Sequence, residues 1–497
     1  MLRPHETIPG RTLRAVLELT SAKSNHPQLD NISITGISID SHQIEAGDLF
    51  VAVAGAKAHG ANFAGDAKLN GAVAVLTDEV GSAIIHDLPV LVVSNPRAVA
   101  GVIAAWLQKE PMRDMFSVAV TGTNGKTTVS TLLYQIAMAT GRQSGLVGTV
   151  QTRIGDEVVS ALRTTPEAPE IQSLAAVMRE RHMQNLFMEV SSHAISLNRI
   201  AGSHFKIAAF TNLSQDHLDF HGTMDSYFAA KADLFTYQYA DSAYINIDST
   251  WGKKLLEIVE LPVVKISRSN KSADWYFERI EIGAQSSAIA IRGTGGILIE
   301  TSTKLVGDFN LDNLLMAISI SVASGIDPVD IAAITPSLTG AEGRLEKVDL
   351  GQSFTALVDY AHSPDSVKSV LETLRKSTTG KIIAVLGCGG DRDKSKRPLM
   401  GAALLAGSDV AIFTSDNPRS ENPEQILKEM IKGLTLSDTS QVEIDRKRAI
   451  EIAVAAAKPS DVVVILGKGH EQGQEIAGVV EPFDDRLVLA AMIEASA

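Results

Sequence analysis

Several features are scarce or missing in this sequence, and each excludes a class of protein. A single cysteine, Cys388, stands among 497 residues, which excludes an intrachain disulfide framework and a thiolate-rich zinc site. No segment reaches the ~20 uninterrupted apolar residues of a membrane span. The opening MLRPHETIPGRTLRAVLELT breaks up its apolar positions with charged residues and proline, unlike a secretory signal. We therefore expect a cytoplasmic protein with no membrane insertion.

Positive charge is also scarce. Lysine and arginine total 45 against 58 acidic residues, which gives a formal net charge of −13. Because general binding to nucleic acid needs basic surface that displaces counterions, we expect no nucleic-acid partner. Because the protein as a whole is acidic, any anionic ligand must be held by a local group of positive or hydrogen-bond-donating residues. The chain also shows no fixed-period repeat and no low-complexity tract.

Apolar material, by contrast, is plentiful, since hydrophobic residues make up 45% of the chain. At roughly 100–200 residues per domain, the length suits about three domains. The charged segment KEPMRD at 109–114 marks a first boundary, and the glycine-containing connector SLTGAEGRLEKV lies at the second. We predict domains over residues 1–112, 113–337 and 338–497.

The rhythm of apolar runs predicts an α/β fold throughout. The first domain reads as a small α/β unit with a helix over 96–108. In the second, buried-strand runs alternate with helical spacing, which predicts a mostly parallel sheet of the P-loop type with helices on both faces. Residues 275–306 predict a small antiparallel meander within it. The third domain is Rossmann-like in the order of its elements. Its predicted helices begin near Ser363, Ser395, Asn422 and Arg446. None of its strands precedes GxGxxG, so nicotinamide binding has no support.

The strongest motif is TGTNGKTT at residues 121–128, between the strand FSVAV and a helical pattern. Its tail, Gly125-Lys126-Thr127, matches the end of the phosphate loop GxxxxGK[ST]. Such a loop directs backbone N–H groups and a helix N-terminus at phosphate oxygens, adds a lysine charge and offers a hydroxyl to Mg²⁺. The alternative is a glycine-rich turn with a surface lysine, which the coincidence of strand, motif and helix disfavours.

Two further groups of polar residues follow buried strands. Glu189 ends the strand of MEVSSHAISLNR, where a carboxylate suits Mg²⁺, although an isolated acid at a strand end is more often a helix cap. A later cluster consists of Asp216, His217, Asp219 and His221. Lys231 follows on an amphipathic helix that opens near Met224. Spacing alone predicts that Lys231 is a solvated helix residue.

These segments, with others, resemble the Mur ligases of peptidoglycan synthesis. The shared motifs are, in order, TGTNGKTT, EVSSH, TNLSQDHLDFHG with YFAAK, GDFNLDN, DYAHSPDS, GDRDKSKRPLMG and GKGHE. The agreement begins with DSHQIEAGDLFVAVAG at residues 40–55 and covers almost the whole chain. The resemblance implies an ATP-dependent ligase that forms an amide bond during cytoplasmic synthesis of peptidoglycan precursors.

The resemblance also implies which residues handle metal and phosphate. Catalytic positions are matched by Lys126, Glu189, His217 and Lys231. Mg²⁺ ligands are matched by Thr127, Glu189, His217 and Lys231. In the family the lysine at the position of Lys231 is carbamylated, which turns a cation into a carboxylate and reverses the prediction from spacing. Two Mg²⁺ ions can screen the repulsion between an anionic carboxylate and the γ-phosphate that it attacks.

ATP is implied as a substrate rather than a resident cofactor. Its contacts are matched by Gly122, Thr123, Asn124, Gly125, Lys126, Thr127, Thr128, Asn310, Asn313, Arg344, Asp359 and His362. The last three belong to the third domain. We therefore expect that domain to close over the nucleotide and keep water from an acyl phosphate.

The acceptor substrate implied is UDP-N-acetylmuramoyl-L-alanyl-D-glutamate. Its contacts are matched by Ile39, Ser41, Thr164, Thr165, Ser191 and Arg199. The family commonly has arginine where His42 stands and glutamine where Leu197 stands.

The segment DNPRSENP at 416–423 bears on which amino acid is added. Read locally it is turn and cap chemistry, but in the family DNPR is the signature of members that add meso-2,6-diaminopimelate. Arg419 can pair bidentately with the distal carboxylate of that substrate. Lysine has no distal carboxylate and would leave the guanidinium unpaired. The matching positions are Arg392, Asp416, Asn417, Pro418, Arg419, Gly467 and Glu471. Of these, Glu471, the Gly467 carbonyl and Asn417 suit the distal ammonium.

The implied reaction runs through an acyl phosphate. The γ-carboxylate of D-glutamate attacks the γ-phosphate, ADP leaves, and the amine of diaminopimelate then displaces phosphate. No enzyme nucleophile is required, because positioning and electrostatics carry most of the rate. The alternatives are a lysine-adding homologue, a folylpolyglutamate synthetase, which the first domain disfavours, and a non-catalytic nucleotide-binding switch. We expect a monomer.

Overall fold

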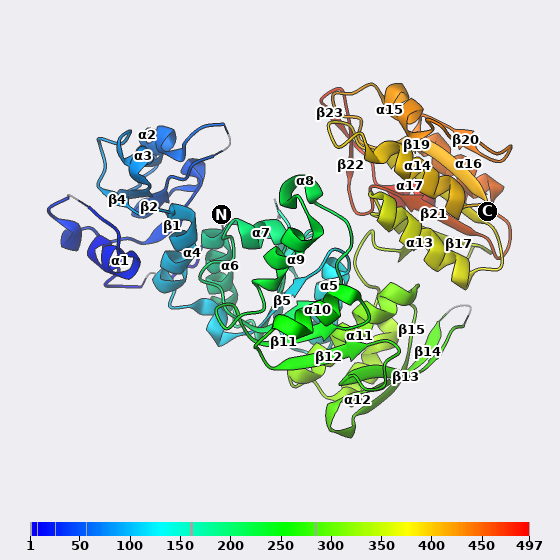
Figure 1. The fold of residues 1–497 in the computed structure, drawn as a ribbon, viewed down its shortest axis with the longest axis horizontal. Coiled ribbons are helices and arrows are strands. Elements are labelled where there is room, and N and C mark those ends of the chain that lie inside the picture. Colours follow the sequence, from blue (N-terminus) through cyan, green and yellow to red (C-terminus); the bar gives the residue numbers. More distant parts are fainter. Residues whose placement is uncertain are drawn as a thin grey trace.

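The computed structural model describes residues 2–6, 8–24, 26–55, 57–159, 163–283 and 286–496. The two outermost residues of the predicted domains, 1 and 497, therefore lie outside the described part. The described residues form three lobes in chain order, with the first and third at opposite ends of the second (Figure 1). The expectation of a three-domain α/β fold is confirmed.

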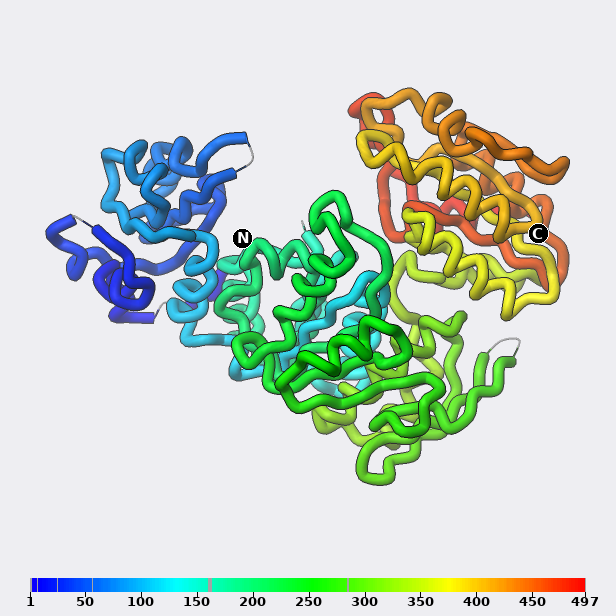
Figure 2. The backbone as a smooth tube through the Cα atoms, in the orientation of Figure 1, coloured from blue at the N-terminus to red at the C-terminus, as the bar shows by residue number. Residues whose placement is uncertain are grey.

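The first lobe is built on a small parallel sheet in the order β1-β2-β3-β4. Its strands are β1 (Gly36–Ser38), β2 (Asp48–Val51), β3 (Ala74–Thr77) and β4 (Val90–Val92). Its helices are α1 (Leu13–Thr20), α2 (Ala64–Leu69), α3 (Glu79–Ser82) and α4 (Pro96–Leu107). The N-terminal end of the chain lies against the second lobe (Figure 2), where Ser173 Oγ donates to Leu2 O over 2.6 Å. This contact ties the first residues to the central domain.

The second lobe contains one long sheet in the order β15-β14-β13-β12-β11-β10-β5-β9-β6-β7-β8. The strands are β5 (Phe116–Thr121), β6 (Ser144–Val147), β7 (Thr152–Ile154), β8 (Glu157–Val159), β9 (Asn185–Glu189), β10 (Phe205–Phe210), β11 (Ala240–Asn246), β12 (Val263–Ser267), β13 (Trp275–Glu281), β14 (Ser287–Arg292) and β15 (Leu298–Thr303). Strands β6 and β9 to β13, with β5, pair in parallel. The predicted meander is present as the antiparallel strands β13 to β15. A second antiparallel extension, β6-β7-β8, was not predicted.

Helices cover both faces of this sheet, because its central strands are apolar on both sides. In β5, Val118 and Val120 pack on one face, whereas Ala119 packs on the other. The helices are α5 (Lys126–Ala139), α6 (Ala168–Glu180), α7 (Ser192–Ser196), α8 (Leu218–His221), α9 (Met224–Ala232), α10 (Thr250–Ile258), α11 (Asp308–Ala323) and α12 (Pro328–Ile334). The parallel centre of the sheet is therefore a buried, rigid base for whatever its strand ends carry.

The third lobe has a sheet in the order β16-β17-β21-β18-β19-β20. Its strands are β16 (Glu346–Lys347), β17 (Thr355–Asp359), β18 (Ile382–Cys388), β19 (Val410–Ser415), β20 (Gln441–Val442) and β21 (Val462–Leu466). A separate hairpin joins β22 (Gly473–Ile476) to β23 (Val479–Pro482). The helices are α13 (Pro364–Ser377), α14 (Lys396–Gly407), α15 (Pro423–Met430), α16 (Arg446–Ala456) and α17 (Asp485–Ser496). Ser363 and Asn422 cap α13 and α15 as their side chains predict.

Within the described ranges, no helix combines the length and the apolarity that crossing a bilayer requires.

Candidate active site

The central strands bring three sequence motifs to one edge of the sheet. Strand β5 pairs in parallel with β9 and β10, with Val120 opposite Glu189 and Thr121 opposite Phe210. The phosphate-loop sequence, the EVSSH segment and the TNLSQDH segment therefore begin at the same carboxyl edge. Ligands of α/β proteins bind at such an edge.

Residues 122–125 form a tight loop between β5 and α5. Gly122 has a φ of +151°, and a Cβ there would lie 1.9 Å from Thr211 Oγ1, so a side chain is excluded. Lys126 Nζ donates to the carbonyls of Gly122 and Thr123 over 2.9 and 3.0 Å. Burial lowers the pKa of Lys126, and the Glu189 carboxylate opposes that shift. The lysine charge is thus folded over the loop, where a phosphate loop needs it.

Glu189 is buried at the end of β9 and is held in one orientation. Its Oε2 accepts hydrogen bonds from Thr127 Oγ1 over 3.0 Å and from Thr149 Oγ1 over 2.9 Å. The Thr149 N–H donates to Oε1 over 2.7 Å. A helix-cap role, the local alternative for this acid, does not describe these contacts. Thr149 was missed by sequence reasoning, because its own segment carries no motif.

Lys231 is not solvated, and the prediction from spacing is wrong. The side chain on α9 is only 1% exposed, and its Nζ donates to Gly122 O over 3.0 Å. Lys126 and Lys231 therefore share one carbonyl oxygen. Burial and then the Lys126 ammonium hold the pKa of Lys231 well below its usual value. Spacing failed because burial depends on a loop 109 residues away in the sequence.

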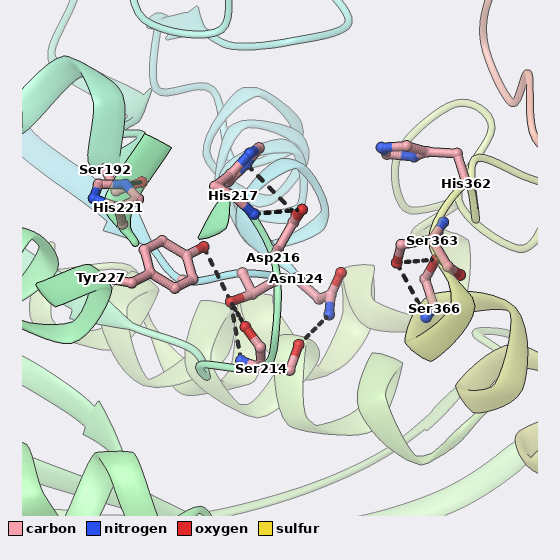
Figure 3. A network of polar contacts seen from close by, with 12 residues as sticks. Asn124, Ser192, Ser214, Asp216, His217, His221, Tyr227, His362, Ser363 and Ser366 are labelled. Atoms are coloured by element: carbon pink, nitrogen blue, oxygen red, sulfur yellow. Dashed lines mark hydrogen bonds and ion pairs between the residues drawn. The ribbon is translucent and has the colours of Figure 1, made fainter. Parts of the chain in front are cut away.

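His217 lies beside these groups at the start of α8, with its Nε2 3.5 Å from Asp216 Oδ2. Burial lowers the pKa of His217, and Asp216 opposes the shift. Figure 3 shows Asp216 and His217 on the central-domain side, with the ring of His362 pointing toward them from the third lobe. All three line one pocket of about 610 Å³.

The side chains present suit Mg²⁺ only with help from other ligands. In the part of the chain that the structure describes, no three His, Cys, Asp or Glu side chains group closely enough to hold a metal ion. The oxygens at hand are the Glu189 carboxylate and the Thr127 hydroxyl, which contact each other. Because Mg²⁺ usually binds through one or two carboxylates plus substrate phosphates, this incomplete set fits a nucleotide-bound metal.

The remaining nucleotide residues lie on both sides of the domain boundary. A Cβ on Gly125 would lie 2.3 Å from Asn313 Oδ1, and Asn313 in turn bonds Asn310. The other three, Arg344, Asp359 and His362, belong to the third lobe. Asn124 Nδ2 donates to Ser214 Oγ over 3.5 Å. Thr123 lies in the loop, and Thr128 lies in the first turn of α5.

In the third lobe these residues surround Tyr360. The Arg344 guanidinium lies 4.7 Å from the centre of the Tyr360 ring, and the His362 ring lies 4.6 Å from it. His362 Nδ1 bonds the Tyr360 carbonyl over 2.9 Å. Asp359 is buried and accepts N–H bonds from Leu345 and Ala361 over 2.7 and 2.8 Å. Burial raises the pKa of the Asp359 carboxyl.

A second pocket, of about 890 Å³, lies between the first and second lobes. Ile39 and Ser41 line it, as does His42, whose Nδ1 lies 3.2 Å from Asp40 Oδ1. Thr164, Thr165 and Ser191 lie deeper, beside Glu189. Thr165 Oγ1 donates to Glu189 O over 2.9 Å, and the hydroxyl oxygens of Thr149 and Thr164 lie 3.0 Å apart. Ser191 N–H donates to Thr165 Oγ1 over 3.1 Å. These five residues thus divide between the pocket and the carboxyl edge of the central sheet, where Glu189 lies.

Arg199, the sixth predicted residue, contacts Glu167, and Glu167 lines the 890 Å³ pocket. Arg199 Nε lies 3.2 Å from Glu167 Oε1, Arg163 Nη1 donates to the same oxygen over 3.1 Å, and Arg97 pairs with Oε2. One carboxylate therefore faces three guanidiniums, which leaves local positive charge at the pocket wall. Sequence reasoning missed Arg97 and Arg163, although Arg163 directly precedes Thr164.

Most of the residues predicted for the incoming amino acid line the 610 Å³ pocket. They are Arg392, Asp416, Asn417, Arg419, Gly467 and Glu471. Pro418 is not in the lining, and its carbonyl instead faces Gly390. Arg419 Nη1 donates to Gly390 O over 2.7 Å, and Asn417 Nδ2 donates to Glu471 Oε2 over 2.7 Å. A guanidinium and a carboxylate are thus presented in one pocket.

Models of three protein-family domains match the sequence. The description "Mur ligase family, catalytic domain" matches residues 33–114, "Mur ligase middle domain" matches 120–321, and "Mur ligase, glutamate ligase domain" matches 343–469. Together they follow the three lobes in order.

Known proteins are similar over nearly the whole length. The UDP-N-acetylmuramoyl-L-alanyl-D-glutamate–2,6-diaminopimelate ligase of Streptomyces coelicolor is 48% identical over 469 residues, which is 93% of this chain and 92% of that protein. A solved structure of a ligase with the same name is 32% identical, covers 99% of both chains and has a TM-score of 0.71. A MurF ligase from Thermotoga maritima, solved in complex with ADP, shares the fold at 17% identity, with a TM-score of 0.62 over 93% of this chain and 97% of that one.

Proposed function

This chain belongs to the Mur ligase family, and we propose that it adds meso-2,6-diaminopimelate to the D-glutamate γ-carboxylate of UDP-N-acetylmuramoyl-L-alanyl-D-glutamate. It is an ATP-dependent ligase that forms an amide bond, with ADP and phosphate as the other products. The observation that carries the proposal is the 610 Å³ pocket, because it joins His217 and Asp216 of the phosphate side to Arg419 and Glu471.

The phosphate loop and the residues around it position ATP and supply positive charge for the first step. The loop N–H groups and Lys126 hold the phosphates of ATP, and Lys126 stabilises charge that develops on the γ-phosphate. Thr127, Glu189, His217 and a carbamylated Lys231 would hold Mg²⁺, with nucleotide oxygens completing the set. Mg²⁺ screens the negative charges that the attacking carboxylate and the γ-phosphate bring together. No covalent enzyme intermediate is needed, and burial raises the pKa of the Cys388 thiol to about 12.

The lowered pKa of Lys231 supports carbamylation at that position. A buried lysine with a depressed pKa keeps more of its neutral amine, which attacks CO₂ and loses a proton to give a carbamate. The product is an anion beside Lys126. Repulsion between two ammonium groups at one carbonyl oxygen is thereby replaced by attraction.

The acceptor substrate spans two sites in this proposal. Its UDP end enters the 890 Å³ pocket near Ile39 and Ser41. Its D-glutamate end reaches the strand edge past Thr164, Thr165, Ser191 and Arg199. The nucleotide contacts of Asn310, Asn313, Arg344, Asp359 and His362 complete the site from two domains.

The diaminopimelate pocket favours its substrate through two charges. Arg419 pairs with the distal carboxylate, with Arg392 beside it, and Glu471 takes the distal ammonium together with Asn417 and the Gly467 carbonyl. L-Lysine offers only the ammonium, so Arg419 would lack the substrate carboxylate and keep only the Gly390 carbonyl and Glu475, whose Oε2 lies 3.7 Å from its Nε.

The test of enzymatic function is phosphate release with substrates omitted one at a time. We expect release only when ATP, Mg²⁺, the UDP-dipeptide and diaminopimelate are all present. A Lys126→Met variant should lose this release. A nucleotide-binding switch would instead bind ATP without releasing phosphate when both other substrates are supplied, and that outcome would refute the proposal.

A further inference from the structure

A buried lysine beside the 610 Å³ pocket has no part in the reaction described so far. Lys468, in the GKGHE segment after β21, is 0% exposed. Its Nζ donates to Gly473 O over 2.6 Å, to Asn417 Oδ1 over 3.2 Å and to Glu471 Oε2 over 3.4 Å. These three acceptors match the three N–H donors of an ammonium. A cation buried this deeply needs such pairing, so its contacts fix its position closely.

Asn417, one of the three partners, has its amide orientation set jointly by Lys468 and the Glu475 N–H. Asn417 Oδ1 accepts from Lys468 and also from the Glu475 N–H over 2.9 Å. The amide nitrogen must therefore point the other way, toward Glu471 Oε2, 2.7 Å distant. A flipped amide would place N–H groups against an ammonium and a backbone N–H.

Glu471, the second partner, accepts both of these hydrogen bonds with the same carboxylate oxygen. Its Oε2 accepts from both Lys468 and Asn417. Among the described residues, no hydrogen bond or ion pair engages Oε1. The side chain is 34% exposed and lines the 610 Å³ pocket. Oε1 is thus the oxygen that remains for a ligand.

We propose that Lys468 is a positioning residue that sets selectivity for an amino-acid substrate with a distal ammonium group. It does not touch the substrate. It orients Asn417 and occupies Glu471 Oε2, so that Oε1 of Glu471 faces the distal ammonium. This inference rests on the proposed function, because it names a determinant of the same amino-acid pocket.

The test compares two substrates in the Lys468→Met variant, which keeps the side-chain length and removes the charge. One substrate is meso-diaminopimelate, and the other is 2-aminopimelate, which keeps the distal carboxylate and lacks the distal amine. We expect kcat/KM for diaminopimelate to fall about tenfold or more, mainly through KM, as for a lost hydrogen bond to a charged group. The value for 2-aminopimelate and the KM for ATP should change little. The preference between the two substrates should therefore shrink.

The matched control is Lys458→Met, which removes an exposed lysine from the same lobe and should leave both substrates unaffected. If Lys468→Met does not fold, as judged by circular dichroism, Lys468→Gln carries the same prediction with a neutral donor in place. Equal losses for both substrates, or an unchanged preference, would overturn the positioning role. If the wild-type protein does not use diaminopimelate, the proposed function itself fails, which is a different result.

Discussion

At the scale of single residues, the centre of the site is the shared bond of Lys126 and Lys231 to Gly122 O. Two buried ammonium groups at one oxygen repel each other, and a carbamate on Lys231 removes that repulsion. We expect Lys231→Ala to lower kcat by roughly 10²-fold or more, the usual scale for a lost charge-stabilising group. Added short-chain carboxylic acids should restore part of the activity, measured as phosphate release.

Lys126→Ala is the control for this rescue, because no carboxylate can replace its cation. Acids should not restore activity to it. Full activity in Lys231→Ala, or equal rescue of both variants, would contradict the metal-bridging role of Lys231.

Asp312 on α11 provides a residue-scale prediction of pH dependence. Burial raises its pKa to about 7, and the nearby Arg268 only partly opposes the shift. In the unfolded chain this carboxyl ionises at much lower pH. The folded state therefore binds more protons, and the penalty for ionising Asp312 grows from about pH 4 to about pH 7.

We accordingly expect Asp312→Asn to stabilise the protein more at about pH 8 than at about pH 5, by on the order of 2 kcal/mol. The measurement is denaturant unfolding at the two pH values, with the exposed Asp330→Asn as control. A gain that is equal at both pH values, or larger at the acidic one, would contradict the assignment.

At the scale of elements, local patterns predicted the helices and strands better than their arrangement. Apolar runs bounded by turns located β5, β9 and β10, and capping side chains located the starts of α13 and α15. The antiparallel strands β7 and β8, the short edges β16 and β20, and the β22–β23 hairpin went unpredicted. Their pairing depends on partners distant in the sequence, which no local pattern encodes.

The site residues also divide into those that a local motif predicts and those that depend on contacts between distant segments. The phosphate loop is contiguous, so its motif was sufficient to find it. The burial of Lys231, the contacts of Thr149 and the role of Lys468 arise only when separate loops meet. The GKGHE motif contains Lys468, but the sequence predicted roles there only for Gly467 and Glu471, and the contacts of Lys468 with Asn417 and Gly473 became visible only in the structure.

One buried ion pair links the elements that carry the amino-acid pocket. Arg446 and Asp485 are both 0% exposed. The Arg446 guanidinium also donates to Ser415 O over 3.2 Å and to Leu466 O over 3.0 Å. These carbonyls end β19 and β21, immediately before the DNPR and GKGHE segments. The pair therefore anchors both segments.

Asp485→Ala leaves a buried guanidinium without its carboxylate, and we expect it to lower the free energy of unfolding by about 3–5 kcal/mol. Denaturant unfolding followed by circular dichroism measures the loss. The double variant Arg446→Met/Asp485→Leu should be less destabilised than Asp485→Ala, because no unpaired charge remains. A loss below about 1 kcal/mol, which an ordinary point substitution also causes, would contradict the anchoring role.

At the scale of the whole molecule, the pockets between lobes do not reverse the net charge of −13, because acidic residues outnumber basic ones in their linings, so single cations such as Lys126 and Arg419 must hold anions. The connector that leads into the third lobe includes Gly343, at a φ of +65°, where a Cβ would lie 2.2 Å from His470 N of the GKGHE loop. Because that obstacle is backbone, it cannot move aside cheaply. The connector and the GKGHE loop are therefore fitted closely together.

We expect Gly343→Ala to raise the KM for ATP and lower kcat about tenfold or more, as small misplacements in closing sites do. Gly351→Ala is the matched control, since Gly351 also has a positive φ but nothing within 4 Å of its Cβ position. Both variants carry the strain of a positive φ, and Gly343→Ala adds the clash with the His470 backbone. Equal kinetic effects in the two would show that the close fit of the connector on the GKGHE loop is unimportant.

The central claim is that this ligase selects diaminopimelate, and a competition measures it most directly. Equal concentrations of meso-diaminopimelate and L-lysine are offered together with ATP, Mg²⁺ and the UDP-dipeptide, and the products are identified by mass spectrometry. The account predicts that nearly all product carries diaminopimelate. A product that carries mainly lysine would contradict it.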